Sequence, residues 1–130
     1  RGIHPAILTD RGLEAALEAL AARAPLPVEV TATPEERLPS SVEAAAYFVV
    51  AESLTNVAKY ARAGHATVSV AKANGSALVE VRDDGVGGAD PAKGTGLAGL
   101  ADRLAAMDGR LEIESNFGRG TIVRARIPCA

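Results

Sequence analysis

The sequence predicts a mixed α/β domain in which helices pack on one face of a single sheet. Helical and strand patterns alternate along its 130 residues in the order αβαββ, loop, αββ. An Asn-Gly pair, Asn74 and Gly75, separates two alternating stretches, ATVSVAK and ALVEVRD, which is typical of a tight β-hairpin. The length is that of one domain, and 48% apolar residues suffice for a real core.

The first third of the chain is predicted to form a helix, a strand and a loop. Residues 9–25, TDRGLEAALEALAARAP, carry apolar side chains at helical spacing from Leu13 onward, and Pro25 ends the pattern. VEVTA, residues 28–32, is predicted as a short strand. TPEERLP, residues 33–39, is polar and bounded by prolines, so we expect a loop.

A long helix is predicted next, starting with a capping box formed by Ser40 and Glu43. It should run to about Arg62, before Gly64 ends it. Its main apolar stripe consists of Ala46, Val50, Leu54, Val57 and Ala61.

The last third should contain one helix and a second strand pair. The helix is expected over Leu97–Met107, and RLEIES and GTIVRARIP are expected to pair across the turn NFGRG. The region before the helix, DDGVGGADPAK, is dense in glycine, aspartate and proline and reads as a loop.

Composition excludes several classes of protein. Fourteen basic against sixteen acidic residues, with no basic run, argue against nucleic-acid binding. The longest apolar run, AAAYFVVA at residues 44–51, is far shorter than a membrane span, and no secretion signal is evident, so we expect a cytoplasmic domain without membrane contact. Cys129 is the only cysteine, so neither a disulfide nor a cysteine metal site can form within one chain.

GTGLAGL, at residues 94–100, matches the G-x-G-x-x-G pattern of dinucleotide-binding folds through Gly94, Gly96 and Gly99. Glu114, twenty residues after Gly94, even stands where such a fold has its ribose-binding acid. That fingerprint must follow a strand directly, however, and a loop precedes it here. An NAD site is therefore the weak alternative, and a helix start that binds the phosphates of a triphosphate is favoured.

Two further segments carry residues suited to a nucleotide. Glu52, Asn56 and Lys59 share one face of the long helix, where an amide oxygen suits Mg²⁺ and an ammonium suits phosphate. A solvated face with a charge pair is the alternative interpretation. Asp83 ends a strand and can accept a hydrogen bond from an exocyclic amine such as adenine N6, while Gly85 and its neighbours let the backbone approach a flat base. An ordinary surface turn is the alternative here.

The four segments ESLTNVAKYA, DDGVGG, GTGLAGL and GRGT, in this order, resemble the N, G1 and G2 boxes and the terminal Gly-Thr of the GHKL (HATPase_c) ATPase superfamily. Within it, the chain resembles the catalytic ATP-binding domain of sensor histidine kinases, and most of all the nitrate-sensor and desaturase-sensor subfamily, which shows a similar opening GIHPAxLTDRGL and tail LxxRLxxxxGxLxIxSxxGxGTxVxxxxP. The resemblance implies a two-layer α/β sandwich, the Bergerat fold, with about three helices on one face of a mixed sheet. It covers residues 1–130, without the family's sensor and dimerisation domains.

The resemblance also implies roles for individual residues. Glu52 and Asn56 would be catalytic, with Asn56 on Mg²⁺ and Glu52 acting through a water. Asp83 would hold adenine N6. The other ATP-binding positions would be Lys59, Tyr60, Gly85, Gly87, Lys93, Gly94, Thr95, Gly96, Leu97 and Thr121.

Two departures from the family pattern stand out. Tyr60 occupies a position where the subfamily commonly has histidine, so a positive charge near the phosphates is replaced by a phenol. The phosphoacceptor histidine of the family lies on a separate helical domain, and neither His4 nor His65 has the acidic neighbour that follows it.

The implied function is histidine autophosphorylation in a two-component system. The domain would bind Mg·ATP and pass the γ-phosphoryl to a histidine on the dimerisation domain, which then serves a response regulator. Members of this family are usually anchored to a membrane, and the isolated domain is expected to be a monomer with little activity. An anti-sigma-factor serine kinase of the same fold and a nucleotide-free interaction module are the alternatives.

Overall fold

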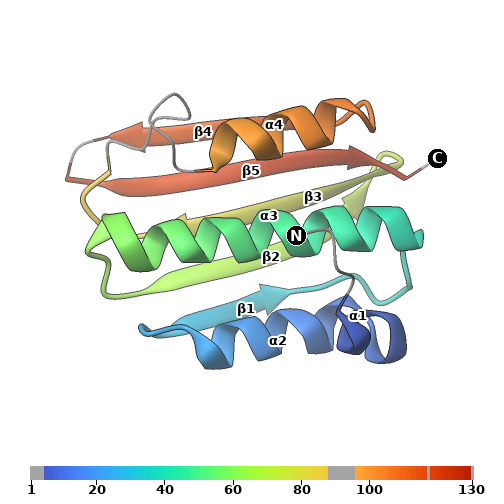
Figure 1. The fold of residues 1–130 in the computed structure, drawn as a ribbon, viewed down its shortest axis with the longest axis horizontal. Helices are drawn as coiled ribbons and strands as arrows, with labels where there is room; N and C mark the ends of the chain where they lie inside the picture. The colour runs from blue at the N-terminus through green and yellow to red at the C-terminus, as the bar shows by residue number, and fades with distance from the viewer. Residues whose placement is uncertain (1–4, 88–95, 117, 130) are drawn as a thin grey trace.

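The computed structural model describes residues 5–87, 96–116 and 118–129, which form a layer of helices on a five-stranded sheet (Figure 1). The elements are α1 (Ala6–Arg11), α2 (Leu13–Arg23), β1 (Val28–Ala32), α3 (Ser40–Asn56), the π-helical turn η1 (Val57–Ala61), β2 (Ala66–Ala73), β3 (Ser76–Asp83), α4 (Leu97–Ala105), β4 (Arg110–Asn116) and β5 (Gly120–Pro128). The predicted order is confirmed, with α1 as an additional helix.

The sheet is mixed, with the strand order β1-β2-β3-β5-β4. β1 and β2 run parallel, and every other neighbouring pair is antiparallel. The predicted hairpin joins β2 to β3, where Ala73 pairs with Ser76. Asn74 and Gly75 between them have φ of 53° and 78°, so both adopt the left-handed conformation that this turn requires.

All the labelled helices lie on one face of the sheet, and the core fills the space between the two layers (Figure 1). α2 packs on β1, α3 on β3 and β5, and α4 on β4. The predicted stripe of the long helix is buried at Ala46, Val50, Leu54 and Val57, while the side chain of Ala61 lies outside the described residues. From the sheet, inward-facing residues of alternate positions, including Val68, Val70, Val79, Val81 and Ile127, complete the core.

The predicted helix over residues 9–25 is wrong in one respect, because Gly12 divides it into α1 and α2. Gly12 has φ of 91°, a value that L-residues rarely adopt, and its N–H donates to the Leu8 carbonyl. Leu13, Ala16 and Leu17 are buried as the helical spacing predicted.

The predicted capping box at Ser40 is also wrong. The helix begins one residue earlier, with Pro39 as its N-cap, so Ser40 lies inside the first turn and makes no capping bond. Pro39 has no N–H for a returning glutamate. The buried Glu43 carboxylate instead accepts the N–H of Leu38 at 3.1 Å and binds the Arg37 guanidinium at 2.9 Å.

The long helix changes character after Asn56. Val57–Ala61 form a π-helical turn, and Arg62, with φ of 51°, ends the helix in place of the predicted Gly64. Insertion of a π turn rotates the residues that follow it relative to α3, and such turns are frequent at functional sites.

Candidate active site

One end of the molecule collects the segments that the sequence singled out. The end of α3, the end of β3 and the start of α4 lie together there, next to the turn between β4 and β5 (Figure 1). Two backbone hydrogen bonds tie these segments to one another. The Asp84 N–H donates to the His65 carbonyl, and the Gly118 N–H donates to the Val86 carbonyl at 2.7 Å.

Asp83 is the buried carboxylate of this region, with 7% of its surface exposed. Its Oδ1 accepts the N–H of Gly85 at 2.8 Å. Burial raises the pKa of the Asp83 carboxyl, while hydrogen bonds from the Gly85 and Thr121 N–H groups lower it and the charge of Asp84 raises it. The two backbone donors thus fix the orientation of the carboxylate and favour its charged form, against the larger effect of burial.

The GRGT segment supports this carboxylate from β5. Gly120 has φ of 82°, and a side chain there would overlap the carbonyl oxygen of Asp83 and come within 3.1 Å of the Asp84 Cα. The next residue, Thr121, pairs with Asp83 across the strands, and its hydroxyl lies 2.8 Å from the Ser115 hydroxyl. Sequence reasoning gave a role to Thr121 and missed Gly120, although the quoted GRGT segment contains it.

Asp84 has a different task from Asp83. Its Oδ1 accepts the N–H groups of Gly64 at 2.9 Å and His65 at 3.1 Å, so it fastens the segment between η1 and β2 to the end of β3. Of the two adjacent carboxylates, Asp84 therefore stabilises the local fold. Asp83 makes no hydrogen bond to the segment between η1 and β2 among the described residues.

Glu52, on α3, reaches the start of α4. A side chain built on Gly96 would overlap its Oε2 and approach its Cδ to 2.9 Å, so the carboxylate lies directly against Gly96. Gly96 has φ of 86° and is the N-cap of α4, whose Leu97, Leu100 and Leu104 are buried. The structure thus brings the predicted catalytic acid to the helix start that was predicted to bind phosphate.

An open cavity of about 290 Å³ lies between α3 and α4 at this point, lined in part by Glu52 and Gly96. Two of its other lining residues, Phe48 and Arg103, contact each other, with the guanidinium carbon 4.6 Å from the ring centroid. Sequence reasoning missed both residues. The LxxRL segment was a signal for Arg103, but it gave no role to the arginine.

Asn56 and Lys59 follow Glu52 along the helix, with Asn56 partly exposed and Lys59 exposed. The Nδ2 atom of Asn56 is buried and has no hydrogen-bond partner among the described residues. The charge pair between Glu52 and Lys59, which the alternative interpretation of this helix face implied, does not form in the described part of the chain. Lys59 lies in η1, beyond the regular helix for which a shared face was predicted, and the Tyr60 side chain lies outside the described residues.

The remaining predicted positions belong to the loop before α4. Gly85 is buried and Gly87 has φ of 74°, so the backbone there takes a conformation suited to glycine. Val86 between them is an exposed apolar residue that sequence reasoning did not single out. Lys93, Gly94 and Thr95 lie outside the described residues.

Comparison with known proteins identifies the family of this chain. Residues 41–130 match the family model described as histidine kinase-, DNA gyrase B-, and HSP90-like ATPase. The chain belongs to this family. Within it, the chain is a histidine-kinase ATPase domain, as its motif order predicted.

Two curated relatives agree with this assignment. The oxygen sensor histidine kinase NreB of Staphylococcus carnosus is 39% identical over 72% of this ATPase domain, and an uncharacterized sensor-like histidine kinase of Chloroflexus aurantiacus is 33% identical over 97% of it. The chain spans only 28% and 24% of the length of these relatives. Both are histidine kinases, which favours the sensor kinase over the anti-sigma-factor alternative.

Solved structures confirm the predicted fold. The blue-light activated histidine kinase EL346 of Erythrobacter litoralis superposes with a TM-score of 0.74, at 23% identity, over 91% of this ATPase domain and 41% of that chain. The histidine kinase AdeS of Acinetobacter baumannii gives a TM-score of 0.66, at 19% identity, over 90% of the domain and 61% of that chain. ShkA, solved in complex with AMPPNP, gives 0.68 at 23% identity, over 91% of the domain and 29% of that chain.

The dinucleotide alternative does not survive. β3 ends at Asp83, well before Gly94, and its sheet neighbours β2 and β5 are both antiparallel to it. A dinucleotide fold needs the strand before the glycine motif to lie parallel and adjacent to the strand that follows the next helix, but β4, the strand after α4, is not a neighbour of β3. Within the described residues, no group of three or more His, Cys, Asp or Glu side chains could hold a metal ion, and no helix there is long and apolar enough to cross a membrane.

Proposed function

We propose that this ATPase domain binds Mg·ATP with adenine at Asp83 and the phosphates at the start of α4, and that it delivers the γ-phosphoryl to a histidine on a separate dimerisation domain. The observation that carries the proposal is the buried, backbone-fixed carboxylate of Asp83 at the same end of the fold as Glu52 and Gly96.

At the adenine end, Asp83 would accept a hydrogen bond from the exocyclic amine. Guanine presents an oxygen at that place, which a carboxylate repels, so the site should select adenine. Thr121 supports the carboxylate through its N–H, and the glycines after Asp83 leave room for the flat base. Exposed Val86 offers an apolar contact beside it.

At the phosphate end, the residues present fit a Mg²⁺–triphosphate group. The buried Nδ2 of Asn56 has no partner among the described residues, and leaving such a donor unbonded is unfavourable, so a hydrogen bond from it to a phosphate oxygen would relieve this cost. Asn56 would hold the ion through its amide oxygen, with Glu52 bound to it through a water. Mg²⁺ is commonly held by one or two protein side chains together with phosphates and waters, and it neutralises phosphate charge when bound.

The remaining residues orient the triphosphate. Lys59, exposed on η1, supplies a positive charge, and the N–H groups at the start of α4 supply hydrogen-bond donors. Lys93, Gly94 and Thr95 would close over the phosphates. Because phosphoryl transfer needs mainly positioning and charge stabilisation, these residues suffice without a covalent intermediate on the domain.

The partners follow from the same proposal. The acceptor histidine would be supplied by the dimerisation domain of the parent kinase, and the phosphorylated kinase would serve a response regulator. The isolated domain would be monomeric and hydrolyse ATP slowly.

Calorimetric titration of the purified chain with ADP, ATP, GTP and NAD tests the nucleotide site. We expect adenine-nucleotide binding that is about 10- to 100-fold weaker in Asp83→Asn, which corresponds to one lost charged hydrogen bond. Asp84→Asn is the matched control, because Asp84 binds only backbone groups of its own fold. Equal binding of GTP and ATP would refute the role of Asp83, and no binding at all would favour the interaction module.

Repeating the titration with and without Mg²⁺ tests the metal assignment. In the wild-type chain, Mg²⁺ should strengthen ATP binding, and in Asn56→Ala this dependence should be lost while Mg²⁺-free ADP still binds. Phosphotransfer is tested in the full-length parent with radiolabelled ATP, where Glu52→Gln should lower histidine phosphorylation without abolishing nucleotide binding.

A further inference from the structure

The sheet has a second face, opposite the helices of the described chain (Figure 1). Along β3, Val79 and Val81 are buried toward the helices, so the alternating residues Leu78 and Glu80 point to the other side. We call this side the open face. Asp83 belongs to the buried register of Val79 and Val81, so the proposed nucleotide site does not include the open face.

A groove of about 770 Å³ lies on the open face over β2, β3, β5 and β4. It forms because β2 contributes small side chains there, while the three neighbouring strands contribute long ones. One transverse row of paired residues crosses it in the order Ala71, Leu78, Arg126, Arg110. Across four strands, the groove therefore changes from apolar to basic.

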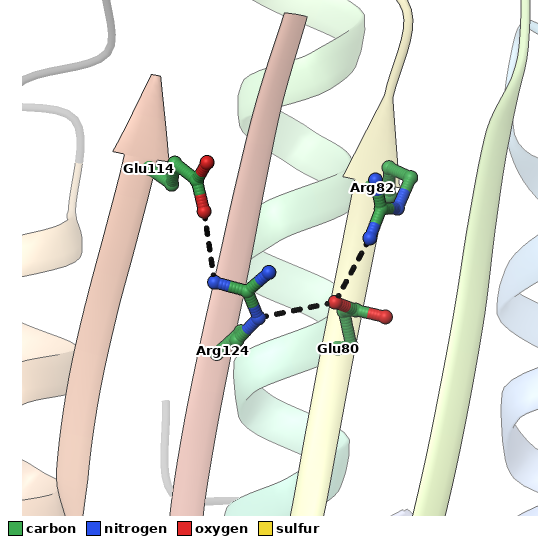
Figure 2. A network of polar contacts seen from close by, with 4 residues as sticks. All are labelled: Glu80, Arg82, Glu114 and Arg124. Atoms are coloured by element: carbon green, nitrogen blue, oxygen red, sulfur yellow. Dashed lines mark hydrogen bonds and ion pairs between the residues drawn. The ribbon is translucent and has the colours of Figure 1, made fainter.

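Most charges on the open face neutralise one another. Arg124 donates through Nε to Glu80 at 3.2 Å and through Nη1 to Glu114 at 3.0 Å, and Arg82 binds the same Glu80 at 3.3 Å (Figure 2). This network joins β4, β5 and β3 and occupies the guanidinium of Arg124 from two sides.

Arg110 and Arg126 are the exception. They stand directly opposite each other on β4 and β5, both are exposed, and in the described part of the chain neither forms an ion pair. The nearest acid along β4, Glu112, also has no ion pair there. Like charges directly opposite each other destabilise a sheet. The pair therefore adds no stability to the free domain. An anion between the two guanidinium groups would be bound by both of them.

We propose that the open face binds a segment of a partner protein that places a carboxylate between Arg110 and Arg126 and an apolar side chain on Leu78. Neighbouring strands lie about 4.8 Å apart, so the point midway between the two arginines is about 7 Å from Leu78 along the row. Two residues of extended chain also span about 7 Å and return the side chain to the same face. The recognised segment therefore carries an apolar residue and an Asp or Glu two positions apart.

The charges of the open face favour a protein over a nucleic acid. Glu80, Glu112 and Glu114 lie on the same face and would repel a long polyanion at several points, whereas a single carboxylate between the two arginines has only Glu112 at a neighbouring position. The apolar part of the groove has no counterpart on a phosphate backbone.

The test is an NMR titration of the isotopically labelled 130-residue chain with two peptides, acetyl-Gly-Leu-Ser-Glu-Gly-amide and the same peptide with Gln in place of Glu. We expect the glutamate peptide to bind with a Kd on the order of 1 mM and the glutamine peptide at least fivefold more weakly. Shift changes should be concentrated at Leu78, Arg110 and Arg126. Equal binding of both peptides, no binding of either, or stronger binding of a single-stranded oligonucleotide overturns the proposal.

Two variants that each remove one positive charge distinguish the contribution of the arginine pair to peptide binding from that of the rest of the open face. Arg110→Gln should weaken the glutamate peptide at least threefold and raise the melting temperature of the free domain by about 1–2 °C, because it removes a like-charge pair. Arg82→Gln is the matched control, since Arg82 lies four residues from Leu78 along β3 and binds Glu80. It should leave peptide binding unchanged and should not raise the melting temperature. A lower melting temperature in Arg110→Gln would contradict the proposal. ADP binding is measured for every variant, so that a failure of this proposal can be told apart from a failure of the nucleotide site.

Discussion

The carbonyl oxygen of Asp83 occupies the space that a side chain on Gly120 would need. This contact brings β5 against the end of β3 at the residue proposed to hold adenine. It also explains why the positive φ of Gly120, 82°, is combined with a close backbone approach, two requirements that only glycine meets together.

Replacing Gly120 by alanine should therefore distort the Asp83 end of the site. We expect Gly120→Ala to lower the free energy of unfolding by more than about 3 kcal/mol, because about 1–2 kcal/mol of backbone strain adds to a collision with backbone atoms that cannot rotate away. Gly118→Ala is the control, since Gly118 has a similar φ of 80° but nothing within 4 Å of an added Cβ. It should show the backbone strain alone. Chemical denaturation measures both, and equal losses would contradict the collision.

The raised pKa of Asp83 predicts that this residue destabilises the ligand-free domain at neutral pH. Burial disfavours the charged form, so the folded protein binds the proton more tightly than the unfolded chain does. The contribution of Asp83 to stability is then fully present below the unfolded pKa of about 3.9 and is lost as the pH rises through the higher folded pKa.

Asp83→Asn should consequently raise the melting temperature of the empty domain at pH 7 while weakening adenine-nucleotide binding. The stability gain should shrink as the pH falls toward the unfolded pKa of about 3.9, because the wild-type carboxyl takes up its proton first in the folded state. Calorimetric melting from pH 4 to pH 8 checks this. A gain that is independent of pH would show that the buried charge is not its cause.

The sequence predicted those parts of the fold that depend on neighbouring residues. Asn74 and Gly75 produce their turn locally, and the alternating stretch ALVEVRD forms the predicted strand, with Val79 and Val81 buried. The same alternation separates Asp83 from Asp84, because Asp83 continues the buried register of Val81. That signal was available in the sequence.

Other features depend on contacts between distant segments and had no local signature. Gly120 meets Asp83 across 37 positions, and Glu43 turns back to Leu38 only because Pro39 begins the helix. A helical pattern also cannot show a π turn, which requires the packing of the whole helix to be known. The position of Lys59 was therefore less predictable than that of Glu52.

The contact between Glu52 and Gly96 predicts a variant that affects function more than stability. In Gly96→Ala, the added methyl would displace the Glu52 carboxylate, which lies on a flexible side chain and can rotate away, so the stability loss should stay near the 1–2 kcal/mol of backbone strain. Histidine phosphorylation by the full-length parent should fall by at least tenfold, because the proposed catalytic acid is moved. Gly99→Ala, with nothing within 4 Å of its added Cβ, controls for stability and should stabilise α4 by about 0.5 kcal/mol. Normal phosphorylation by Gly96→Ala would remove Glu52 from the mechanism.

Glu43 links three segments far from the proposed nucleotide site. Its buried carboxylate binds Arg37 and the N–H of Leu38, and the Arg37 side chain in turn lies 3.5 Å from the position of a Cβ on Gly12, between α1 and α2. Glu43→Ala leaves the buried Leu38 N–H without its acceptor and should lower the free energy of unfolding by about 2 kcal/mol.

Two variants establish whether this loss comes from the hydrogen bonds. Glu43→Gln keeps an acceptor for Leu38 while losing the ion pair, so it should cost clearly less than Glu43→Ala. Glu36→Ala, at an exposed position of the same loop, should change stability by no more than about 0.5 kcal/mol. If Glu43→Gln proves as damaging as Glu43→Ala in urea denaturation, the charge pair with Arg37 holds the loop, and the backbone hydrogen bond to Leu38 contributes little. ADP binding should be retained in all three variants, because none of these residues lies at the end of the fold that carries Asp83 and Glu52.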